Sequence, residues 1–137
     1  MANYFEMVSQ SVIEGLRRAN YDLNKFRPAS IKAGFFADRA EVMIAEHSAQ
    51  TFANILRIRQ SKGEVFTPQL IEKEAILFAA ESAYLNATGA IRIYSATGKN
   101  TSKFVQGARE ALEIMKKYGH RAVDFYEQIF KVLIGEE

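Results

Sequence analysis

The sequence contains no cysteine and no tryptophan, and its 137 residues include only two prolines and two histidines. Without cysteine the chain can form no disulfide, no thiolate metal site and no cysteine nucleophile. The longest purely apolar run is 75–80, far shorter than the ~18 residues that suggest a membrane-spanning helix. No basic stretch followed by an apolar core opens the sequence, so we expect no signal peptide and an intracellular, soluble protein.

Charge of one sign is not in excess either. Apolar residues make up 48% of the chain and charged residues 25%, and the formal net charge is +2. This composition is typical of a globular protein and contains no global signal for nucleic acid or membrane binding. The length predicts a single domain, residues 1–137, with a core of its own.

The few helix breakers divide the chain into four segments. They are Pro28, the stretch 63–68, and the stretch 98–101. Helical periodicity between them predicts helices at about 3–26, 30–60, 68–97 and 102–134. Because short loops favour antiparallel neighbours, we predict an all-α, antiparallel up-down-up-down four-helix bundle with long helices and short loops.

The two middle helices are apolar on more than one face, whereas the first and last helices each show one apolar stripe. The second apolar set of the helix at 30–60 comprises Ala33, Ala37, Ala40, Ile44, Ile55 and Ile58. The helix at 68–97 is polar only along Glu74, Glu81, Thr88 and Arg92. A solitary bundle needs one buried stripe per helix, so the surplus apolar surface requires a cover.

Two explanations of this surplus remain open. One is an irregular bundle in which the third helix is central; the other is self-association, most simply an isologous dimer. The residues expected at such an interface are Ala37, Ala40, Ile44, Ile55, Ile76, Ala80, Ala83, Ala87 and Ala90. The leading hypothesis is therefore a non-enzymatic, self-associating helical bundle that serves as an assembly, structural or adaptor subunit.

Basic residues are expected to gather at one pole of the bundle, where the first and third loops meet. They are Lys25, Arg27, Lys32, Arg92, Lys99 and Lys103, with Asp22 as the nearby opposing charge. The second hypothesis is that this pole binds a polyanion or a nucleic-acid backbone. The alternative is that lysines at helix ends merely favour solubility. Only Phe26 and Tyr94 are expected close by, so aromatic side chains for base stacking are few and we expect no sequence-specific readout.

No catalytic residue, metal site or cofactor is predicted. Both His47 and His120 fall on polar positions and are interpreted as solvated, and neither has a glutamate three residues before it, as a carboxylate-bridged metal pair would need. Asp38 lies in an apolar stripe, which indicates either a partner at the open end of the bundle or a polar pocket. A small-molecule site or enzyme at Asp38 is the third and least supported hypothesis.

Overall fold

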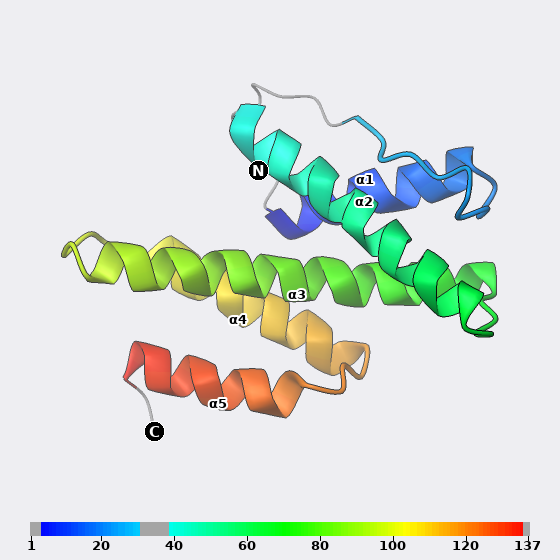
Figure 1. Cartoon of the computed structure of the whole chain (residues 1–137). Coiled ribbons are helices and arrows are strands. Elements are labelled where there is room, and N and C mark those ends of the chain that lie inside the picture. The colour runs from blue at the N-terminus through cyan, green and yellow to red at the C-terminus, as the bar shows by residue number, and fades with distance from the viewer. Residues whose placement is uncertain (1–3, 31–38, 136–137) are drawn as a thin grey trace. The chain divides into compact units, whose positions relative to one another are not determined.

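The computed structural model of the chain describes residues 4–30 and 39–135, which form five α-helices and no strand (Figure 1). The helices are α1 (Tyr4–Arg18), α2 (Arg39–Ser61), α3 (Pro68–Ser95), α4 (Ser102–Lys117) and α5 (Val123–Ile134). The all-α class is confirmed. The count of four helices is not confirmed, because the expected fourth helix is two helices.

The chain divides into two compact units, residues 1–79 and residues 80–137, and the boundary falls inside α3. The first unit contains α1, α2 and the first half of α3. The second unit contains the rest of α3 with α4 and α5. The single domain expected from the chain length stays a prediction, because two compact units that share one helix do not decide whether they fold as one domain or as two.

The first helix is shorter than the expected 3–26, because it ends at Arg18. Two residues just after it, Asn20 (φ 53°) and Tyr21 (φ 62°), adopt the left-handed conformation that stops a helix. Among residues other than glycine, asparagine adopts this conformation most readily. The Tyr21 hydroxyl donates a hydrogen bond to the Glu72 carboxylate of α3 at 3.2 Å. The helix end is therefore fixed by a left-handed turn that has neither glycine nor proline.

The segment after α1 turns back across that helix. The Ala29 amide donates to the Ser11 carbonyl at 3.1 Å, and the Ser11 hydroxyl donates to the Ala29 carbonyl at 2.8 Å. A Cβ built on Gly15 would lie 2.7 Å from a ring carbon of Phe26 and would also collide with the Arg27 carbonyl oxygen. The absence of a side chain at Gly15 thus permits the close return of the chain.

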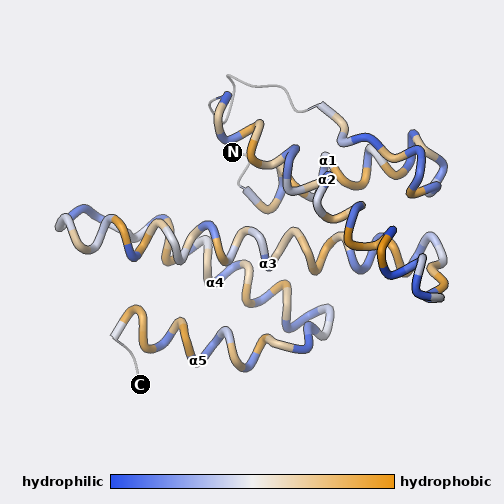
Figure 2. Tube along the Cα trace, viewed as in Figure 1, coloured by the Kyte–Doolittle hydropathy of each residue, from blue (hydrophilic) through white to orange (hydrophobic). Residues whose placement is uncertain are grey.

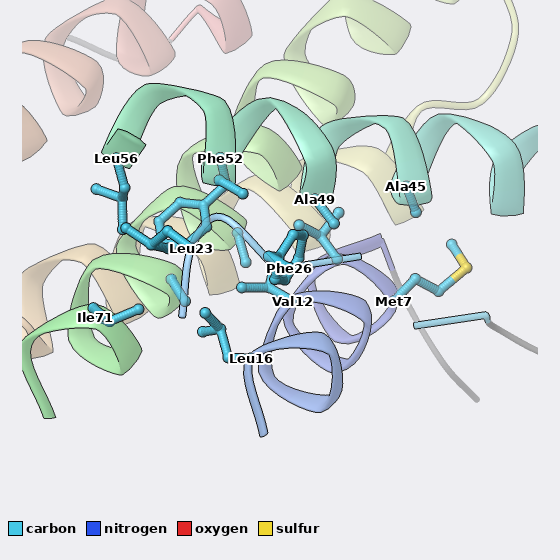
Figure 3. Packing of buried hydrophobic residues seen from close by; sticks show 14 of the residues in the cluster. Met7, Val12, Leu16, Leu23, Phe26, Ala45, Ala49, Phe52, Leu56 and Ile71 are labelled. Carbon is cyan, nitrogen blue, oxygen red and sulfur yellow. The ribbon is translucent and has the colours of Figure 1, made fainter. Parts of the chain in front are cut away.

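The core of the first unit lies between α1, α2 and the start of α3 (Figure 3). Buried residues of α2 include three alanines and Phe52, whose ring lies 5.4 Å from that of Phe78. The helix start expected at residue 30 is not confirmed, because Ser30 is described and is not helical. The described part of α2 begins at Arg39, and the segment 31–38, which includes Asp38, lies outside the described residues.

Thr67 is the N-cap of α3. The Leu70 amide donates to the Thr67 hydroxyl at 3.1 Å, and Pro68 takes the first helical position. Just after the other end of α3, Gly98 has φ +74°, the left-handed conformation in which a glycine commonly closes a helix.

The expected helix 102–134 is broken by a glycine-centred turn. Gly119 has φ +72°, its amide donates to the Lys116 carbonyl, and the His120 amide donates to the Met115 carbonyl at 2.8 Å. These two hydrogen bonds form the Schellman arrangement that ends a helix at a left-handed glycine. The sequence predicted a helix that runs through Gly119, since apolar residues keep their helical spacing on both sides of it. That prediction was wrong, because Gly119 ends one helix and the next begins at Val123.

Candidate functional site

A stripe of exposed isoleucines and half-buried polar residues runs along α2 on a different side from its buried face. We call it the α2 stripe; its residues are Ile44, Ser48, Thr51, Ile55 and Ile58, and they span about 80° of the helix circumference at 100° per residue. The exposed fractions of the three isoleucines are 54%, 43% and 55%. Figure 2 shows hydrophobic positions recurring along α2. The first unit therefore leaves an apolar strip of α2 uncovered.

The two end residues of the α2 stripe are symmetric about Thr51. Ile44 and Ile58 each lie seven residues from Thr51, which is about 10 Å along the helix axis. His47 and Ile55 lie four residues to either side of it. A helix face with such symmetry can pair with itself in antiparallel orientation.

Of the interface residues expected on α2, Ala40, Ile44 and Ile55 are exposed, and Ala37 lies outside the described residues. Those expected on α3 behave differently. Ala80, Ala83 and Ala87 are buried within one copy, while Ile76 and Ala90 are half-buried. A Cβ built on Gly107 of α4 would lie 4.0 Å from the Ala87 Cβ, so the small α3 residues accommodate a helix of the same chain.

The six basic residues expected at one pole are divided between the two units. Exposed Lys25 and Arg27 follow α1 in the first unit, and Lys32 lies outside the described residues. Exposed Arg92, Lys99 and Lys103 belong to the second unit, at the end of α3 and the start of α4.

The connection between α3 and α4 combines aromatic and basic side chains in what we call the Tyr94–Phe104 cluster: Tyr94, Lys99, Lys103 and Phe104. The two rings stack with centroids 5.4 Å apart and an interplanar angle of 19°. The Lys99 ammonium lies 5.3 Å from the Tyr94 ring centroid, and the Lys103 ammonium 5.0 Å from that of Phe104. The sequence interpretation missed Phe104 because its spacing assigned it to the core face of the last helix.

The stretch of sequence that contains this cluster lacks acidic residues. Residues 82–109 contain no Asp or Glu but include four basic residues. In the described part of the chain, no ion pair joins Lys99 or Lys103 to a carboxylate. The positive potential at the α3–α4 connection is therefore not neutralised by neighbours in the sequence.

His120 is not solvated, contrary to the sequence interpretation. Its Nε2 lies 2.6 Å from the Glu81 carboxylate, its Nδ1 accepts the Ala122 amide hydrogen at 3.0 Å, and its side chain is 14% exposed. Because Nδ1 accepts, Nε2 must carry the proton and donate to Glu81. The imidazole thus connects the turn before α5 to α3. His47 is exposed, as expected.

Two tyrosines lie beside this contact, and burial raises the pKa of both. The Tyr126 pKa is raised by burial first and then by the charge of Glu81 and a hydrogen bond to it. Burial raises the Tyr84 pKa, which the charge of Arg92 opposes. The Tyr84 hydroxyl donates to the Tyr126 carbonyl at 2.9 Å, and the rings meet edge to face at 4.7 Å. Both phenols thus remain protonated and serve packing.

A shallow groove of about 240 Å³ lies on α4 and α5. It is lined by Arg109, Leu112, Glu113, Lys116, Glu127, Phe130 and Lys131. An ion pair of 2.5 Å joins Lys116 and Glu127 in its lining, and hydrogen bonding to Glu127 is the main cause of the raised Lys116 pKa. The charges in this groove are mixed, so they favour no ligand of one sign.

Across the described residues, no group of three or more His, Cys, Asp or Glu side chains could hold a metal ion. None of the helices in the same residues is both long and apolar enough to cross a bilayer. No protein-family model matches the sequence, and no curated protein or solved structure does either.

Proposed function

We propose that this protein is a non-enzymatic subunit of a homo-oligomer, and that two copies associate through the α2 stripe. The observation that supports this proposal best is the exposure of three isoleucines on one side of a helix whose other side is already packed. Isolated exposed apolar residues are normal on protein surfaces. A row of them on one helix face is typical of a surface that packs against another helix.

The proposed occupant is a second copy, because the isoleucines at the two ends of the stripe can pair with each other across a two-fold axis. In an antiparallel pair centred on Thr51, Ile44 of one copy meets Ile58 of the other, and this contact occurs twice. Ile55 then meets His47, whose ring has an apolar body. Met43, which is 60% exposed, lies beside Ile44 and extends the apolar area at each end.

The contact is small. The segment from Ile44 to Ile58 is about 21 Å long, so the pair buries an area at the lower end of specific interfaces. Contacts of that size are commonly weak or transient, and we expect association to become visible at micromolar concentration.

Sedimentation velocity over a concentration series tests the proposal, with Ile58→Asp as the disruptive variant. Burying two aspartates in the pair should leave that variant monomeric at concentrations where the unmodified chain dimerises. Val65→Asp is the matched control, because Val65 is 84% exposed and lies outside the α2 stripe, in the connection before α3.

If the unmodified chain remained monomeric at high micromolar concentration, the proposal would be contradicted. Dimerisation that survives Ile58→Asp would place the contact elsewhere and would also contradict it. Circular dichroism of both variants checks that the helical content is retained, which is expected because both side chains are exposed.

A further inference from the structure

The Tyr94–Phe104 cluster places an aromatic pair beside exposed positive charge on a single connection between helices. Both rings are half-buried, and both lysine side chains are exposed. Each ammonium lies 5.0–5.3 Å from a ring centroid, within the distance of a cation–π contact. A contact of this kind at an exposed site is weak, so either lysine can leave its ring for a stronger anionic partner.

The path of the chain explains why these groups meet. α3 ends just after Tyr94, and the Lys99 amide donates to the Tyr94 carbonyl at 3.0 Å, which turns the chain back. α4 then begins at Ser102, so that Phe104 lies in its first turn. Ile93, the residue before Tyr94 in the sequence, is 66% exposed.

We propose that this cluster binds single-stranded nucleic acid. Lysines supply phosphate contacts, and an aromatic face supplies a stacking platform for a base; together these are the two components of binding that does not depend on sequence. Isolated phosphate or a polyphosphate would use only the lysines. A duplex keeps its bases stacked on one another and leaves the rings without a partner.

In the proposed complex, Lys99 and Lys103 turn outward to two phosphates, and a base stacks against the Tyr94–Phe104 pair. Arg92 lies in the last turn of α3 and adds positive charge near the site. Because residues 82–109 include no acidic residue, this stretch of the chain itself contributes no carboxylate that would repel the strand. The site lies wholly in the second unit, so this inference does not depend on the α2 stripe.

The test is fluorescence anisotropy of a labelled oligothymidine of about 15 nucleotides, measured with the full chain at several salt concentrations. With two phosphate contacts, the slope of log affinity against log salt should be about −1.4, so affinity should fall about sevenfold between about 50 and 200 mM salt. Lys99→Gln should reduce that fall to about threefold, because one phosphate contact is lost.

Replacement of the ring has a different signature. Tyr94→Ala should lower the affinity about tenfold while leaving the salt slope unchanged, and Tyr94→Phe should retain the unmodified affinity. Lys117→Gln is the matched control, because the Lys117 ammonium also lies over a tyrosine ring, 5.5 Å from that of Tyr118, but outside the cluster. It should change neither the affinity nor the slope.

Four results would overturn the inference. They are no binding of the oligothymidine at about 50 mM salt, equal affinity for a duplex of the same length, equal losses with Tyr94→Ala and Tyr94→Phe, and a Lys117→Gln loss as large as that of Lys99→Gln. Vesicles containing phosphatidylserine form a further arm. Binding to them that the oligothymidine does not compete away would assign the cluster to a lipid surface and would likewise overturn it.

Discussion

Cysteine cross-linking can test the antiparallel register of the α2 pair directly, because the chain has no cysteine of its own. In that register Ile44 faces Ile58 of the other copy, and two Ile44 positions are separated by about 21 Å along the helix axis. A disulfide requires Cα atoms about 4.4–6.8 Å apart. Ile44→Cys and Ile58→Cys should therefore form a disulfide with each other when mixed, and neither should do so alone.

The assay is a non-reducing gel after mild oxidation of each variant alone and of the equimolar mixture. Val65→Cys provides the background of random collisions, since Val65 is highly exposed and lies outside the stripe. Rapid cross-linking of Ile44→Cys to itself would indicate a parallel pair and would refute the symmetry argument. Cross-linking of the mixture no faster than that background would refute the contact itself.

Two further predictions concern the stability of each unit. Gly15→Ala should destabilise the first unit by about 1–3 kcal/mol, because the new methyl group collides with the segment that returns across α1. Gly89→Ala, where a Cβ on α3 meets open space, should instead stabilise the protein by about 0.5–1 kcal/mol. Urea denaturation measures the free energy of unfolding of both variants. Equal effects of Gly15→Ala and Gly89→Ala would contradict the steric argument. The raised pKa of Tyr126 means that its phenol proton is held more tightly in the folded state than in the unfolded state, where the pKa of a tyrosine is about 10. Titration of Tyr126 should thus leave the free energy of unfolding unchanged below about pH 10. It should lower that free energy as pH rises through the folded-state pKa, and the decrease should be less steep in Tyr126→Phe. Identical dependence of unfolding free energy on pH in the unmodified protein and in Tyr126→Phe would contradict this prediction.

The helices could be located from the sequence wherever periodicity and a strong breaker coincide. The start of α3 is such a place, because Thr67 and Pro68 together form a cap that tertiary contacts do not alter. The end of α1 could not be located, since the left-handed turn at Asn20 and Tyr21 contains neither glycine nor proline, and the Tyr21 side chain contacts Glu72, far along the chain. Gly119 was visible, but a helix tolerates one glycine, and local periodicity does not reveal whether the chain turns there.

The candidate sites show the same distinction between local pattern and packing. The outer isoleucines of α2 could be identified from spacing alone, because exposure follows from which helix face packs. The alanines of α3 have similar spacing, yet they are buried, and spacing does not distinguish a partner helix of the same chain from one of another copy. The meeting of Tyr94 with Phe104 depends on the geometry of one turn, which composition does not specify.

The distribution of side-chain size on α2 argues that its outer face has a role beyond folding. Three of the six buried residues of this helix are alanines, at Ala45, Ala49 and Ala53, whereas large isoleucines occupy the exposed face. Isoleucine has a lower helix propensity than alanine, lysine or glutamate, so an exposed isoleucine costs helix stability and gains little from burial within the chain. Selection for the stability of a single copy would favour the opposite arrangement, with large side chains inside and polar ones outside. When this face is covered by a second copy, the cost is offset, because the isoleucines are then removed from water as core residues are.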